Sequence, residues 1–153
     1  MMRSINLIVV HCTATKEGID YGVKAVRRWH INRGFSDIGY HMLIHLDGRI
    51  EMGRPIEKAG AHAKGFNANS IGVVYEGGLD SRGNPKDTRT VPQYHALRRC
   101  VETLKVIYGD VDVVGHRDLS VDLNGDGVIS KGEWMKACPS FDVKTELDKI
   151  NAS

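Results

Sequence analysis

Residues 5–15 of the chain have the sequence Ile5-Asn6-Leu7-Ile8-Val9-Val10-His11-Cys12-Thr13-Ala14-Thr15. The first six form a largely apolar run rich in β-branched residues, which is typical of a strand buried in the centre of a sheet. A histidine and a cysteine follow this run directly. In open α/β sheets, ligands bind beyond the carboxyl ends of the strands. The stretch therefore predicts a central strand with His11 just past its end, where chemistry is expected.

Strands and helices are expected to alternate along the rest of the 153-residue chain. Apolar runs predict strands, helical spacing of apolar residues predicts helices, and Asp47-Gly48 suits the tight turn of a hairpin. The expected strands are residues 5–10, 40–46, 49–52, 70–75 and 111–114, and the expected helices are roughly residues 22–32, 92–108 and 143–150. This alternation predicts an α/β fold, a single domain over residues 1–153, with a central mixed β-sheet flanked by helices on both faces.

A second histidine, His116, follows the strand expected at residues 111–114, as His11 follows the first strand. If these two strands are parallel, both imidazoles lie at the same edge of the sheet. Tyr40 begins the first strand of the hairpin. Its hydroxyl reaches that edge as well if the hairpin strand runs antiparallel to the first strand.

The composition argues against several classes of function. The formal net charge is only +2, so no strongly basic surface for nucleic acid is expected. No apolar run is long enough to span a bilayer, and we expect no membrane partner. The N-terminus has one basic residue, a short apolar run and no small-residue cleavage site. We therefore expect no signal peptide, a chain that is cytoplasmic as synthesised, and a monomer by default.

The three cysteines do not suggest a disulfide framework, because their number is small and odd. Cys100 shares a helical face with leucines and is expected in the core, while Cys12 should point to the opposite face of its strand from His11. Cys138, beside a proline and outside any apolar periodicity, remains for chemistry. His11, His116 and Cys138 would give a tetrahedral zinc three protein ligands and leave one position open, as in catalytic zinc sites.

Other histidines are expected to be structural. His41 and His45 have the spacing of a metal pair on a helix, but the glycines at positions 39 and 48 bracket them as a strand. We expect both to be structural or to line a groove. His30 and His95 are expected to be ordinary packed or surface residues.

Seven short stretches carry a resemblance that runs through nearly the whole chain. They are His11-Cys12-Thr13-Ala14-Thr15-Lys16, Gly39-Tyr40-His41 with Asp47-Gly48, His62-Ala63-Lys64-Gly65 with Asn69-Ser70-Ile71-Gly72-Val73, Gly115-His116, and Lys136-Ala137-Cys138-Pro139-Ser140-Phe141-Asp142. With these motifs in this order, the chain resembles the zinc-dependent N-acetylmuramoyl-L-alanine amidases (amidase type 2) found among phage lysozyme-amidases and peptidoglycan recognition proteins.

The resemblance implies a hydrolase that cuts the amide between the lactyl group of N-acetylmuramic acid and the L-alanine of the stem peptide. It implies a catalytic Zn²⁺ and a peptidoglycan or muropeptide substrate. The implied zinc ligands are His11, His116 and Cys138, the implied catalytic pair is Tyr40 and Lys136, and the implied substrate contact is His62. A cell-wall enzyme without a signal peptide suits phage or prophage release, and a recycling enzyme in the cytoplasm is the other possibility.

Residues 122–133 match the calcium loop of an EF-hand. Side-chain oxygens would come from Asp122, Asn124 and Asp126, a carbonyl from Val128, a direct or water-mediated contact from Ser130, and a bidentate carboxylate from Glu133, with Gly127 at the sharp turn. No flanking helices and no second loop are expected. We therefore predict an isolated EF-hand-like loop, inserted in the amidase pattern, that binds a structural Ca²⁺ and orders the segment carrying Cys138.

Two functions other than hydrolysis are consistent with parts of this pattern. A peptidoglycan-binding module of the same fold would hold muropeptides without cutting them; such members commonly lack the cysteine ligand, so Cys138 favours the enzyme. A calcium sensor is the other alternative, but a lone loop without exiting helices has no element to open.

Overall fold

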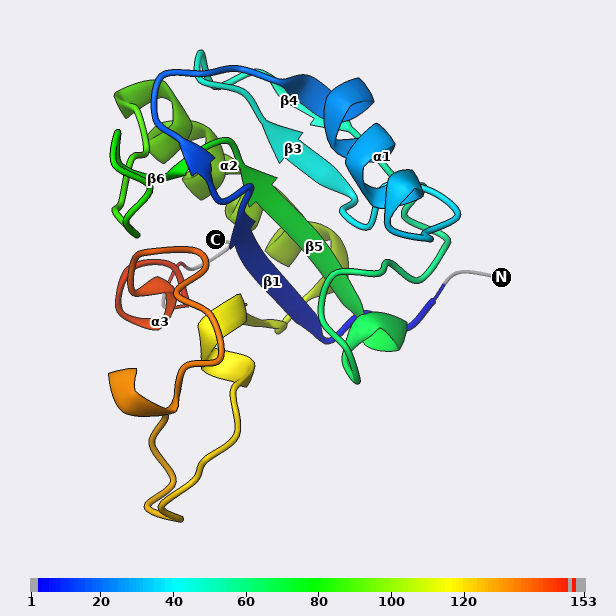
Figure 1. Cartoon of the computed structure of the whole chain (residues 1–153). Helices are drawn as coiled ribbons and strands as arrows, with labels where there is room; N and C mark the ends of the chain where they lie inside the picture. Colours follow the sequence, from blue (N-terminus) through cyan, green and yellow to red (C-terminus); the bar gives the residue numbers. More distant parts are fainter. Residues whose placement is uncertain (1–2, 149, 151–153) are drawn as a thin grey trace.

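The computed structural model describes residues 3–148 and 150. Its centre is a five-stranded sheet in the order β4-β3-β5-β1-β7, in which only β4 is antiparallel to its neighbour (Figure 1). These strands are β1 (Leu7–Cys12), β3 (Met42–Ile44), β4 (Ile50–Met52), β5 (Ser70–Tyr75) and β7 (Asp112–Gly115). Two short strands, β2 (Thr15–Lys16) and β6 (Gly78–Leu79), pair separately in parallel.

Helices cover both faces of the sheet, as predicted (Figure 1). Helix α2 (Val91–Tyr108) packs on the face that carries Ile8 and Val10, and the short helix α3 (Val143–Glu146) adds to the same core. Helix α1 (Gly22–Asn32) packs on the opposite face, against Leu43 and Val74. The sheet is therefore the middle of three layers, which is why β1 and β5 are apolar along nearly their whole length.

Most of the expected elements are confirmed, with the largest shifts at their ends. Strand β5 and helix α1 have the predicted bounds, and the hairpin of β3 and β4 forms around Asp47-Gly48 but is shorter than expected. Strand β1 continues through Cys12, so His11 lies inside the strand rather than beyond it. Helix α3 ends at Glu146, and residue 149 of the expected helix lies outside the described residues.

The hairpin strand does not have the antiparallel direction that would bring Tyr40 to the edge where β1 ends. Strand β3 pairs with β5 in parallel, and β5 pairs with β1 in parallel, so β3 also runs parallel to β1. The physical reason is the helix between them: a strand, a helix and a strand of the same sheet form a crossover unit, whose strands are parallel. Tyr40 therefore enters the site from across the sheet face, not from the edge where β1 ends.

The 3-10 turn η2 (His116–Leu119) precedes the predicted calcium loop, η3 (Lys131–Glu133) forms its last three residues, and no α-helix flanks it within the described chain. A third 3-10 turn, η1 (Asn67–Asn69), leads into β5. The segment between η2 and η3, drawn in yellow and orange, projects away from the sheet (Figure 1). Among the residues described, no helix is both long enough and apolar enough to cross a bilayer.

Candidate metal and catalytic site

The sheet register brings His11 and His116 together. Val9 of β1 is paired with Val114 of β7, and the two residues share a face of the sheet. His11 lies two positions further along β1, so its side chain leaves from that same face, and His116 is the first residue of η2, directly after β7. Their ring centroids are 4.6 Å apart. Parallel pairing of β1 and β7 therefore brings the imidazoles together, one from within β1 and the other from the turn that directly follows β7.

Cys138 is held beside them by hydrogen bonds on either side of it. The Arg117 backbone N–H donates to the Cys138 carbonyl at 2.8 Å, and the Tyr75 hydroxyl donates to the Pro139 carbonyl at 2.6 Å. The Ser140 hydroxyl donates to the Gly78 carbonyl at 3.0 Å. These bonds join the segment to β5, β6 and η2, so the cysteine is fixed by groups far away in the sequence.

The three side chains predicted to bind a metal converge. One ligand atom each from His11, His116 and Cys138 lies within 4.8 Å of the other two. The Cys138 Sγ is 3.8 Å from Nδ1 of His11, and it accepts a hydrogen bond from the Cys12 backbone N–H at 3.1 Å. The contact with the Cys12 thiol and burial raise the pKa of the Cys138 thiol well above its usual range, and the Cys12 backbone donor only partly offsets them. The thiol is therefore protonated without a metal, and a cation bound there would stabilise the thiolate that coordinates it. The Cys12 side chain itself packs in the core on the other face of β1, as expected.

The two imidazoles are in the form that a metal needs. Burial lowers the pKa of His11 well below its usual range, and the neighbouring charges of His62, His116 and Lys136 lower it further. Burial and Lys136 also lower the pKa of His116. Both rings are therefore neutral near pH 7, with a lone pair free to coordinate.

His62 lies behind His11. Its Nδ1 is 2.9 Å from Nε2 of His11, and its Nε2 is 3.2 Å from the Ser70 hydroxyl. The ring fits because position 72 is glycine, where a Cβ would come within 2.7 Å of it. The sequence suggested that His62 contacts substrate. In the structure the ring is 8% exposed and both of its nitrogens are engaged, a position that favours orientation of His11.

The predicted catalytic pair borders the same site. The Tyr40 ring is 5.0 Å from that of His11, and burial raises the pKa of its hydroxyl, which therefore stays protonated. The Lys136 side chain is exposed, and its charge acts on both His11 and His116. A neutral hydrogen-bond donor and a cation thus lie near the three side chains predicted to bind the metal.

The comparisons with known proteins agree with this arrangement. A family model described as N-acetylmuramoyl-L-alanine amidase matches residues 1–140. The chain belongs to the N-acetylmuramoyl-L-alanine amidase family. Its fold and enzyme class are thus those that the sequence motifs predicted.

Individual relatives support the same assignment. The endolysin of Klebsiella phage KP32 is 41% identical over 142 residues, which are 93% of this chain and 85% of that protein. The structure of the amidase LysC from Clostridium intestinale superposes with a TM-score of 0.71 at 27% identity, over 95% of this chain and 86% of that one. The structure of peptidoglycan recognition proteins LCa and LCx in complex with tracheal cytotoxin superposes with a TM-score of 0.72 at 25% identity, over 95% of this chain and 84% of that one.

The acidic loop also forms a cluster, with ligand oxygens of Asp122, Asp126 and Glu133 within 4.8 Å of one another. The Glu133 carboxylate accepts hydrogen bonds from the backbone N–H groups of Leu123, Asn124 and Ser130. Beyond the loop, the Arg117 guanidinium stacks 3.8 Å from the ring of Trp134. The loop is therefore closed by its own last residue, and its base is packed against η2.

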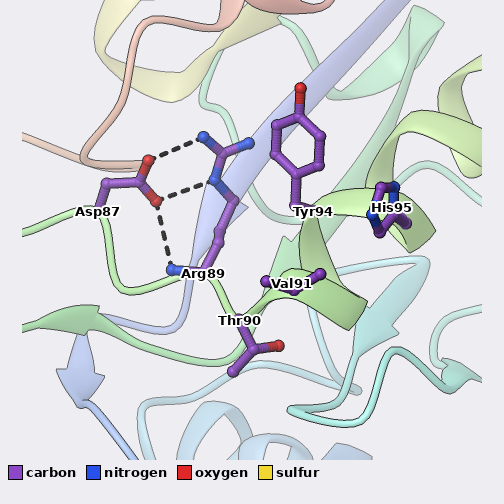
Figure 2. Close-up of a pocket in the computed structure, with 6 residues that line it drawn as sticks. All are labelled: Asp87, Arg89, Thr90, Val91, Tyr94 and His95. Atoms are coloured by element: carbon purple, nitrogen blue, oxygen red, sulfur yellow. Dashed lines mark hydrogen bonds and ion pairs between the residues drawn. The ribbon is translucent and has the colours of Figure 1, made fainter.

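A shallow pocket of about 360 Å³ lies at the start of α2 (Figure 2). It is lined by Asp87, Arg89, Thr90, Val91, Tyr94 and His95. The Arg89 guanidinium pairs with Asp87 at 2.8 Å and with Glu146 at 2.8 Å, and it stacks on Phe141. Because this cation already joins the loop to the segment after Cys138, the pocket has a structural explanation, and none of the predicted site residues lines it.

The Tyr75 tether gives a direct test of how Cys138 is positioned. Replacing Tyr75 with Phe removes the hydrogen bond to the Pro139 carbonyl, which should cost about 1 kcal/mol and lower the melting temperature by roughly 2–4 °C. Metal affinity should fall with it, since the bond holds the residue next to Cys138. Tyr94→Phe is the matched control. Equal melting curves and equal metal affinity for the Tyr75→Phe and wild-type proteins would contradict the tether.

Proposed function

We propose that the chain is a zinc-dependent amidase that hydrolyses the bond between the lactyl group of N-acetylmuramic acid and L-alanine in peptidoglycan. The observation that carries the proposal is the convergence of His11, His116 and Cys138 within 4.8 Å. Two neutral imidazoles and one thiol are the donor set of a catalytic zinc site with an open position. Tyr40 and Lys136 supply the additional donors that amide hydrolysis needs.

Zinc bound by these three residues would supply a Lewis acid for the scissile carbonyl and would acidify the attacking water. The hydrogen bond with His62 determines which ring nitrogen of His11 carries the proton. If His11 coordinates through Nδ1, which faces Cys138, its Nε2–H donates to Nδ1 of His62, and the Nε2–H of His62 donates to Ser70. Such outer partners of metal-binding histidines fix the tautomer and the ring orientation.

Tyr40 and Lys136 act on charge that develops at the substrate. The Tyr40 hydroxyl, protonated at working pH, donates a hydrogen bond that orients the attacking water or the carbonyl oxygen. The Lys136 ammonium stabilises the negative charge of the tetrahedral intermediate. It can also give a proton to the departing amine of L-alanine. The products are the lactyl carboxylate and a free stem peptide.

The relatives support a cell-wall substrate. The related proteins are named as phage endolysins, and one structural relative is a recognition complex that holds tracheal cytotoxin. For this chain we propose that peptidoglycan or a soluble muropeptide binds over His11 and His116, beside Lys136. A phage-type release to the wall accounts for the relation to endolysins.

The acidic loop is proposed to bind Ca²⁺ through the oxygens of Asp122, Asn124, Asp126 and Glu133 and the carbonyl of Val128. Two features support this proposal: the clustering of three carboxylates and the match to EF-hand ligand positions. Ligation would exchange some of the hydrogen bonds that Glu133 now accepts for bonds to the ion. Calcium would then hold the segment that carries Trp134, Lys136 and Cys138.

Cys138→Ser and Lys136→Ala test the hydrolase. The wild-type protein with zinc should release stem peptides from purified peptidoglycan, measured by mass spectrometry. Cys138→Ser should lose the bound zinc and the activity, while Lys136→Ala should keep zinc and lose activity by about 10²–10³-fold. Cys100→Ala and Lys144→Ala are the controls. If the zinc-loaded wild type releases nothing, while Cys138→Ser binds muropeptide as tightly as wild type, the binding-module function replaces this proposal.

His62→Ala tests the orienting role. Loss of an outer partner of a metal ligand typically lowers metal affinity by about 10–100-fold, so zinc binding measured by competition with a chelating dye should weaken by that factor. At saturating zinc, the Michaelis constant for a muropeptide should stay near the wild-type value. His95→Ala should change neither quantity. Unchanged zinc affinity with a raised Michaelis constant would instead return His62 to the substrate-contact role.

Glu133→Gln tests the calcium loop. With calcium at roughly 100 times its Kd, the wild-type melting temperature should rise by roughly 5–10 °C, because the ion binds only the folded chain. Glu133→Gln should lose most of that rise, and Asp110→Asn, an exposed carboxylate outside the loop, should keep it. Identical wild-type melting curves with and without calcium would refute the proposal.

A further inference from the structure

A second group of metal-binding side chains lies apart from the amidase site. His45 directly follows β3, and Glu76 directly follows β5, so two neighbouring parallel strands deliver them to the same edge. Asp20 comes from the turn before α1, and one ligand atom of each of the three lies within 4.8 Å of the others. None of these residues has a role in the proposed hydrolysis.

Glu76 is the unusual member of the group. It is 0% exposed, and its Oε1 accepts hydrogen bonds from the backbone N–H groups of Tyr21 and Gly22 at 2.7 and 2.8 Å. Its other oxygen, Oε2, is buried without a hydrogen-bond partner among the described residues. That oxygen faces Nδ1 of His45 at 3.5 Å. Burying an unpartnered carboxylate oxygen is costly unless a cation or proton occupies the space before it.

His45 has the orientation of a metal ligand. Its Nε2 lies 2.8 Å from Oε1 of Glu51, so a proton on Nε2 is donated to a carboxylate. Nδ1 then carries the lone pair, and it points between Asp20 Oδ1 at 2.9 Å and Glu76 Oε2 at 3.5 Å. A carboxylate behind the imidazole is the usual outer partner of a metal-binding histidine.

The charges around His45 leave room for a cation. Three carboxylates, those of Asp20, Glu51 and Glu76, surround one imidazole. Over residues 3–148 and 150, no lysine or arginine lies within ion-pair distance of these carboxylates. Even a protonated His45 would balance only one of the three negative charges. Backbone N–H groups at the start of α1 donate hydrogen bonds to Oε1 of Glu76 and Oε1 of Glu51, but none reaches Oε2 of Glu76.

We propose that Asp20 Oδ1, His45 Nδ1 and Glu76 Oε2 form a second site for a divalent metal ion. One imidazole with two carboxylates suits borderline ions such as zinc rather than magnesium or calcium, which prefer oxygen ligands alone. Ligands about 2.0–2.1 Å from a tetrahedral zinc lie about 3.3 Å apart. The observed separations of 2.9 and 3.5 Å bracket that value. Asp20 is exposed, which leaves access for a water ligand.

The ion would connect three elements of the fold. It would join the turn before α1 to the ends of β3 and β5, on the face where α1 packs. Gly22 fits this junction closely, because a Cβ there would lie 3.2 Å from Cε1 of His45 and 3.4 Å from Oε1 of Glu51. A bound ion would therefore hold the start of α1 on the sheet through residues that are not part of the catalytic cluster.

Zinc stoichiometry tests the proposal. The metal-free full-length chain is titrated with Zn²⁺ by calorimetry, with saturating calcium present so that the acidic loop is not counted, and bound zinc is checked by elemental analysis. The wild type should bind two zinc ions per chain. Glu76→Gln, which keeps an oxygen for the two backbone donors, should bind one, and so should Asp20→Asn, an exposed change that spares the core. Glu57→Gln, an exposed control, should bind two.

Two further readouts separate this site from the amidase site. Cys138→Ser should lose the catalytic zinc and keep the second ion, so the count does not depend on activity. Zinc-loaded Glu76→Gln should keep wild-type peptide release. One zinc per chain in the wild type, Glu76→Gln and Asp20→Asn alike would overturn the proposal. So would a doubly protonated His45 at pH 7, seen by ¹⁵N NMR and unchanged by excess zinc, because a proton would then occupy the position of the metal.

Discussion

The parallel pairing of β1 with both β5 and β7 is the constraint on which the rest of the structure depends. It pairs His11 of β1 with Val74 of β5, and on the other side of β1 it places His116 one residue past the end of β7. Parallel strands with side chains in register give neighbouring residues a common face. The apolar pairs that lock the register, such as Val9 with Val114, therefore also fix the distance between the two imidazoles.

The remaining groups of the site reach this frame through polar contacts. One ring nitrogen of His62 is hydrogen-bonded to His11 and the other to the Ser70 hydroxyl. The segment that carries Cys138 is held by hydrogen bonds to β5, β6 and η2. Buried polar contacts of this kind contribute modest net stability, but they define one geometry. The core thus supplies the stability of the site, and a few directional bonds supply its precision.

Much of this could be predicted from the sequence, for reasons that differ between elements. β5 and α1 have strong periodicity and clear ends, so their bounds were found. The convergence of His11, His116 and Cys138 was predicted from strand ends and family motifs. The direction of β3 stayed open, because no local pattern shows how the chain crosses over through α1 to a strand parallel with β5. The roles of Tyr75, His62 and Glu76 depend on partners 51 to 64 residues away, such as Glu76 with Tyr21, and no local pattern encodes such contacts.

The backbone bond from Arg117 to Cys138 joins the two ends of the acidic loop. Residues 118–137 therefore form a loop whose two ends are already held together. The entropy cost of lengthening such a loop grows only with the logarithm of its length. Segments of other lengths and chemistries can therefore occupy this position while the cysteine keeps its place. The exposed tip of the loop is a site where a wall-binding peptide or a reporter can be inserted. Insertions at the same position can add new regulation during evolution.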